Sequence, residues 1–106
     1  MTIIADIEIE LSPYLYAGTV ATKMLAEAFE KIWNTRRLSQ RQLAARLGYR
    51  SSVPLSHMAT GRVPIPISRV SDLSRVLKID EAALLIAVLE QRHPDVEFKR
   101  ILQTFS

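Results

Sequence analysis

Glycine and proline divide the sequence from residue 39 onward into short segments, and each segment carries apolar residues at helical spacing. Gly48 and Gly61 each follow one such segment. The run Pro64-Ile65-Pro66 separates two others, and Pro94 ends a further one. Proline disrupts a helix interior, and glycine commonly ends a helix in the left-handed conformation. The sequence therefore predicts an all-α fold of five or six short helices.

Capping residues and helix breakers set the bounds of the predicted helices. Ser39 is suited to cap a helix, and Gln42 follows three residues later, in the position of a capping-box partner. Pro54 is tolerated only in the first turn of a helix, so one helix begins at about Ser52. The predicted helices run from Ser12-Pro13 or Gly18-Thr19 to about Asn34-Thr35, from Ser39 to Gly48, from Ser52 to Gly61, from Ile67 to Leu77, from Glu81 to Gln91, and from Asp95 onward.

Residues 1–12 differ from the rest of the chain. Ile7-Glu8-Ile9-Glu10-Leu11 alternates apolar and acidic residues with a period of two, which is typical of a half-buried strand. No other segment has this pattern. We therefore expect an extended N-terminal arm, which would form a β-strand if it finds a strand to pair with. The arm would pair with its copy in a second subunit, lie against the helices or remain loose.

The positive charge of the chain is concentrated in its middle. The net charge is only +3, yet residues 36–75 contain eight arginines and a single acidic residue, Asp72. Arginine binds phosphate or guanine through a planar fork, whereas lysine offers a point charge. This distribution indicates a surface that binds a polyanion, and the alternative is an ordinary solvated helix surface.

Residues 38–61, LSQRQLAARLGYRSSVPLSHMATG, resemble the helix-turn-helix of the Cro and phage-repressor family, also called the XRE family. The resemblance covers about 60 residues through Leu77, although the turn contains one residue more than is usual. A weaker similarity to small proteobacterial and phage members continues to Pro94. The fold implied is that of phage-repressor DNA-binding domains. The residues expected to pack where the two short helices cross are Leu43, Ala44, Leu47, Leu55 and Met58.

The resemblance also implies roles for individual residues. The second short helix of the motif would enter the major groove of double-stranded DNA. Its polar face would read bases, and residues at the helix ends and in the turn would contact phosphates. The predicted base-reading residues are Ser52, Val53, Ser56 and His57. The predicted phosphate-binding residues are Gln40, Arg41, Arg50, Ser51, Thr60 and Arg62.

Two apolar features lie outside the motif. Trp33 falls on the apolar stripe of the first helix, and we expect it in the core rather than as a stacking platform. A C-terminal stripe is expected to be buried, against its own domain or against a second copy. Together with the arm it forms the predicted dimerisation surface, which comprises Phe98, Ile101, Leu102, Phe105, Ile7 and Ile9.

The sequence disfavours an enzyme. Ser56 and His57 are adjacent, so on a helix they point about 100° apart and cannot form a nucleophile and base pair. His57 and His93 lack a third clustered ligand, and only three glycines are present. We therefore expect no enzymatic activity, no cofactor, no metal and no small-molecule substrate. The acidic N-terminus and the lack of cysteine and of long apolar runs predict a cytoplasmic protein, associated with the nucleoid through DNA.

These expectations combine into one functional hypothesis. We divide the chain into an arm (1–12), a helix-turn-helix domain (13–92) and a C-terminal helix that serves as a candidate dimerisation element (93–106). The domain would bind a pseudo-palindromic operator as a homodimer and act as a small transcriptional regulator, with repression preferred. The alternative is an interaction module of the same fold, such as an antitoxin or an adaptor that binds a partner protein.

Overall fold

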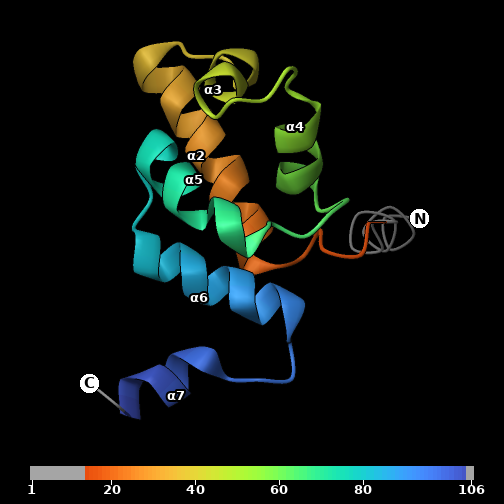
Figure 1. The fold of residues 1–106 in the computed structure, drawn as a ribbon, viewed down its shortest axis with the longest axis vertical. Coiled ribbons are helices and arrows are strands. Elements are labelled where there is room, and N and C mark those ends of the chain that lie inside the picture. The colour runs from red at the N-terminus through yellow and green to blue at the C-terminus, as the bar shows by residue number, and fades with distance from the viewer. Residues whose placement is uncertain (1–13, 105–106) are drawn as a thin grey trace, which may run out of the picture.

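The computed structural model describes residues 14–104 (Figure 1). This part of the chain contains six α-helices and one 3-10 turn, and it contains no strand, so the predicted all-α class is confirmed. The arm, with Ile7 and Ile9, and Phe105 lie outside the described residues. The elements are α2 (Val20–Arg36), α3 (Gln40–Arg46), α4 (Val53–Thr60), η1 (Ile67–Arg69), α5 (Val70–Leu77), α6 (Glu81–Arg92) and α7 (Phe98–Thr104).

Local capping chemistry explains most of these bounds. The hydroxyl of Thr19 accepts a hydrogen bond from the backbone N–H of Thr22, so α2 starts at the second of its two predicted positions. At α6 the carboxylate of Asp80 accepts from the N–H of Ala83. The helix predicted over 67–77 begins with a 3-10 turn, and its α-helical part starts only at Val70.

Helix α2 lies at the centre of the fold, where it contacts α4, α5 and α6 (Figure 1). Its buried stripe faces apolar side chains from each of those helices, which gives the domain one continuous core. The largest fully buried side chains of that core are Leu25, Leu43, Leu55, Met58, Ile65, Leu73, Leu84 and Val88.

The buried side chain of Gln91 carries polar groups into this core. The amide oxygen of Gln91 accepts from the backbone N–H of Ile65 at 2.8 Å. The amide nitrogen donates to the hydroxyls of Thr19 at 2.9 Å and Thr22 at 3.2 Å. A buried polar group is costly unless it is hydrogen-bonded. These hydrogen bonds of Gln91 therefore favour one relative position of α6, the start of α2 and the segment before η1.

Candidate nucleic-acid interface

Helices α3 and α4 pack against each other through the apolar residues that the sequence predicts. Leu43, Ala44, Leu47, Leu55 and Met58 are all buried, which confirms this part of the core. The capping box at the start of α3 is also present. The hydroxyl of Ser39 accepts from the N–H of Gln42, whose side chain accepts from the N–H of Ser39 at 2.8 Å. The start of α3 is thereby held by its own side chains.

The turn between the two helices passes through glycine in a left-handed conformation. Gly48 has φ +82°, and the next N–H, of Tyr49, donates to the carbonyl of Ala44 at 2.9 Å. The phenol oxygen of Tyr49 accepts from Nε of Arg69 at 3.0 Å, and the guanidinium carbon lies 4.4 Å from the ring centroid. Arg69 thus stabilises the turn from η1 instead of extending into solvent.

The exposed face of α4, with Arg62 just beyond its end, brings together five of the ten predicted DNA-contacting residues. Val53, Ser56, His57, Thr60 and Arg62 line a shallow depression of about 170 Å³. Val53 is 52% exposed, and Ser56 and His57 are half-buried. The side chains of this face are short or flat, which allows the close approach that reading bases in a major groove requires.

The start of α4 uses the two preceding serines differently. Ser52 is half-buried and makes no capping hydrogen bond with its side chain. The hydroxyl of Ser51 instead accepts from the N–H of Val53 at 3.3 Å. Ser51, which the sequence assigns to phosphate binding, therefore also has a local structural role.

Arg62 follows α4 and joins a cluster that sequence reasoning missed. Its guanidinium donates to the phenol oxygen of Tyr14 at 2.5 Å and lies 4.6 Å from the centroid of that ring. A second guanidinium nitrogen lies 3.5 Å from Nε2 of His57. Tyr14 lines the same depression as the α4 side chains. No local pattern signals this contact, because Tyr14 and Arg62 are 48 residues apart.

The remaining predicted phosphate ligands surround α3 and α4. Arg41 and Arg50 are exposed, and Gln40 is half-buried at the first position of α3. Thr60 is exposed, but its hydroxyl donates to the carbonyl of Ser56 at 2.8 Å, so its proton is used within the helix. Thr60 also lines a second depression, of about 560 Å³, together with Gln40. The α4 face and the start of α3 therefore share one continuous surface.

Trp33 borders this second depression, and the prediction that it lies in the core is wrong. It is 47% exposed, although the preceding residue, Ile32, is buried. Adjacent residues on a helix point about 100° apart, and that rotation carries Trp33 beyond the face of α2 that the other helices cover. The guanidinium carbon of Arg37 lies 5.4 Å from the ring centroid.

The structure separates the eight arginines of residues 36–75 into two groups. Asp72 forms ion pairs with Arg75 at 2.9 Å and with Arg69 at 3.7 Å. Within residues 14–104, the other arginines of that segment have no carboxylate within ion-pair distance; all of them are exposed. This second group comprises Arg36, Arg37, Arg41, Arg46, Arg50 and Arg62.

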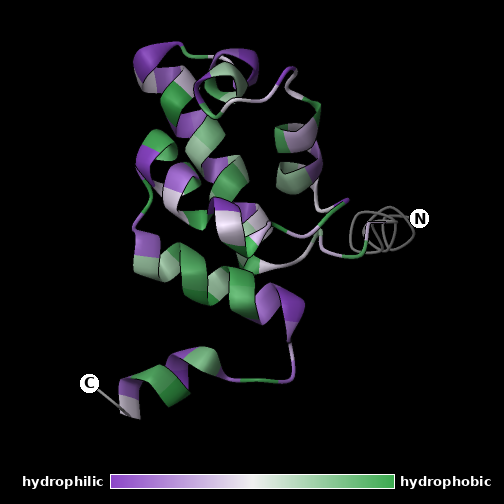
Figure 2. Cartoon of the chain, in the orientation of Figure 1, coloured by the Kyte–Doolittle hydropathy of each residue, from purple (hydrophilic) through white to green (hydrophobic). Residues whose placement is uncertain are grey.

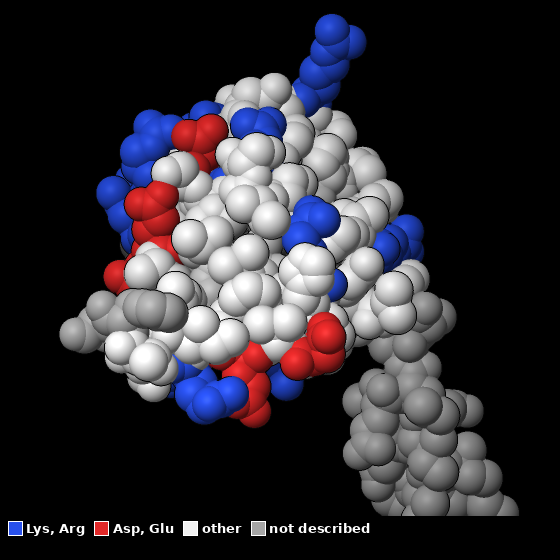
Figure 3. Space-filling view, turned by 60° about the horizontal axis from the view of Figure 1, so that its bottom comes forward, with Lys and Arg blue, Asp and Glu red and all other residues white. Residues whose placement is uncertain are grey.

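The opposite end of the domain is formed by α6 and α7 (Figure 1). Figure 2 shows hydrophobic residues along both helices, whereas α3 and the adjacent end of α2 are mainly hydrophilic. Figure 3 views the α6–α7 end, where charged side chains lie mostly around the edge of an uncharged surface.

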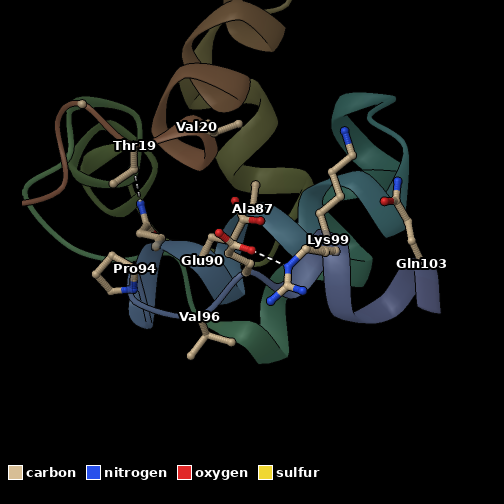
Figure 4. A pocket seen from close by; sticks show the side chains of 12 residues that line it. Thr19, Val20, Ala87, Glu90, Pro94, Val96, Lys99 and Gln103 are labelled. Carbon is tan, nitrogen blue, oxygen red and sulfur yellow. Dashed lines mark hydrogen bonds and ion pairs between the residues drawn. The ribbon is translucent and has the colours of Figure 1, made fainter. Parts of the chain in front are cut away.

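Helix α7 packs loosely on the rest of the domain. None of its residues is buried; Ile101 is 40% and Leu102 47% exposed, and Phe98 is half-buried beside His93. A depression of about 530 Å³ remains between α7, α6 and the start of α2 (Figure 4). Phe98, Ile101 and Leu102, the described residues of the C-terminal stripe, are therefore not buried against their own domain.

Comparison of the sequence with protein-family models and with curated proteins, and of the structure with solved structures, found no match. The resemblance to the XRE family stays a prediction from the residues themselves. Between residues 14 and 104, no helix combines the length and apolarity needed to cross a membrane. In the same part of the chain, no group of three or more histidine, aspartate or glutamate side chains is arranged to hold a metal ion.

Proposed function

We propose that this protein is a sequence-specific double-stranded DNA-binding regulator that inserts α4 into the major groove. The observation that carries the proposal is the combination of a buried α3–α4 crossing with an exposed, uncharged α4 face flanked by arginines that have no carboxylate partner among residues 14–104. A groove-reading helix needs short polar side chains facing bases and cations at its ends facing phosphates.

The proposed roles follow from these positions. Val53 offers a methyl-contacting side chain for thymine, and Ser56 and His57 offer hydrogen bonds to base edges; Ser52 lies at the helix start beside them. Arg50 and Arg62 border the two ends of α4 and neutralise phosphates, with Arg41 extending that contact along α3. Gln40, Ser51 and Thr60 contact the DNA backbone between the phosphates that these arginines bind.

We further propose that the protein acts as a homodimer on a pseudo-palindromic operator and represses transcription there. One α4 spans only one half-site, so tight and selective binding requires a second copy. We place the contact between the two copies on the α6–α7 surface, and the exposed apolar side chains of α7 support that location. The same surface would bind a different protein in an antitoxin or adaptor, which is the second candidate function.

Fluorescence anisotropy tests DNA binding with two labelled duplexes, the region upstream of the protein's own gene and a mixed sequence of equal length. Arg50→Ala and Arg62→Ala should weaken binding to both duplexes and lower the salt slope by about one unit per contact in each subunit. Arg75→Ala is the matched control, because it removes the same charge from a residue already paired with Asp72. The affinity of the Arg75→Ala variant for both duplexes should remain close to that of the wild type.

A second pair of variants separates base reading from backbone contact. His57→Ala should weaken binding to the preferred site by about 1–3 kcal/mol and have little effect on the mixed duplex. Ser68→Ala, which truncates an exposed polar side chain of η1 outside the predicted contacts, is its control and should leave both affinities unchanged. Absence of binding to any duplex, together with capture of a partner by the α6–α7 surface, would favour the adaptor function.

A further inference from the structure

The chain segment before α2 is attached to the end of α4. The backbone N–H of Tyr16 donates to the carbonyl of Gly61 at 3.0 Å. The approach is so close that a Cβ atom at Gly61 would lie 2.3 Å from both Cα and N of Ala17. Segment 14–18 is therefore held against α4 by backbone contacts.

Tyr14 extends this contact onto the proposed DNA-reading face. Its ring and phenol oxygen bind the Arg62 guanidinium, which itself lies near His57. Since Tyr14 lines the depression on α4 together with Val53 and Ser56, residues 1–13 join the domain at the edge of that face.

The charge of residues 1–13 is complementary to this surface. They contain three acidic residues, Asp6, Glu8 and Glu10, and no lysine or arginine. The surface that they adjoin has Arg50 before α4 and Arg62 after it, and neither has a carboxylate partner among residues 14–104. Opposite charges held on one chain favour contact without the cost of bringing two molecules together.

The connecting chain is long enough for that contact. Glu10 precedes Tyr14 by four residues and Glu8 by six, which correspond to reaches of at most about 14 Å and about 21 Å. Helix α4 has eight residues and is therefore about 12 Å long. Both glutamates can reach the whole length of α4 from the position of Tyr14.

We propose that the acidic segment 1–13 docks on the arginine-flanked α4 face and competes there with DNA for Arg50 and Arg62. Exposed ion pairs are individually weak, so the tethered segment would lower DNA affinity by a modest factor of about 3 to 10. A duplex, with its much higher charge density, displaces it. The competition rests on the proposed function, whereas the docking itself does not require DNA.

The docking is tested on the full chain without DNA by comparing NMR spectra of the wild type with those of a triple variant, Asp6→Asn, Glu8→Gln and Glu10→Gln. We expect shifts of the Arg50 and Arg62 side-chain resonances and of the α4 amide resonances. Raising the salt from about 0.1 M to about 1 M shortens the screening length from about 10 Å to about 3 Å, and should move the wild-type resonances toward those of the variant. Unchanged α4 and arginine resonances would overturn the proposal.

A matched control separates docking from a change in net charge. The variant with Glu27→Gln, Glu90→Gln and Asp95→Asn also removes three negative charges, but from α2, α6 and the segment after α6. Its α4 and arginine resonances should coincide with those of the wild type. If they shift as much as in the first variant, the proposal is wrong.

The competition is tested by anisotropy with a mixed-sequence duplex. The Asp6, Glu8 and Glu10 variant should bind about 3 to 10 times more tightly than both the wild type and the control variant. An equal gain in the control variant would show a general charge effect and refute competition, and weaker binding by the first variant would identify residues 1–13 as a DNA-contacting arm instead. If no protein binds any duplex while the NMR shifts are observed, the proposed DNA-binding function fails and the docking stands.

Discussion

Gly48 and Gly61 have nearly the same left-handed backbone conformation, but a side chain would find very different space at the two positions. Their φ angles are +82° and +85°. A Cβ atom at Gly48 would meet nothing within 4 Å, whereas at Gly61 it would overlap the backbone of Ala17 at 2.3 Å. Backbone cannot rotate aside as a side chain can, so alanine at Gly61 must displace segment 14–18 from α4.

The difference in stability follows from these contacts. Alanine at either position costs about 1 kcal/mol for the left-handed conformation. At Gly61 the displaced segment also loses the hydrogen bond from Tyr16, which contributes about 0.5–1.5 kcal/mol, and repacking costs about 1–3 kcal/mol. We therefore expect Gly48→Ala to lower the free energy of unfolding by about 1 kcal/mol and Gly61→Ala to lower it by about 3–5 kcal/mol.

Urea unfolding followed by far-UV circular dichroism measures both values. Gly18→Ala provides a baseline, because Gly18 lacks a positive φ and a Cβ there meets nothing within 4 Å. It should change stability by less than about 0.5 kcal/mol. Equal losses for Gly48→Ala and Gly61→Ala would refute the reasoning, since they would mean that segment 14–18 does not pack against α4.

Three further predictions test the core and the assembly. Ala44→Leu should overpack the α3–α4 crossing, lower stability by about 1–3 kcal/mol and abolish DNA binding; a stable variant with full DNA affinity would contradict the motif. Gln91→Leu should cost about 2–4 kcal/mol in thermal unfolding, because the buried N–H of Ile65 loses its partner and the hydroxyls of Thr19 and Thr22 each lose one hydrogen bond. Phe98→Asp with Leu102→Asp should convert a dimer to a monomer in light scattering, and a double variant that remains dimeric would place the contact elsewhere.

Local interactions determined much of the fold, and these were readable from the sequence. The capping box of Ser39 and the left-handed glycines that end α3 and α4 depend on neighbours within a few positions. Hydrogen bonds and φ preferences of this kind act over one turn of chain, so their residue types are enough to predict them.

Tertiary packing decided the features that join distant segments. The exposure of Trp33, the pairing of Arg69 with Tyr49 and the contact of Arg62 with Tyr14 all depend on where α2, η1 and segment 14–18 lie relative to one another. The amphipathic pattern of a helix shows which face is apolar, but it does not show how far its neighbours extend along and around that face. The ion pairs of Asp72 with Arg69 and Arg75 are not of this kind, because each joins residues three positions apart along η1 and α5 and so depends on local spacing alone.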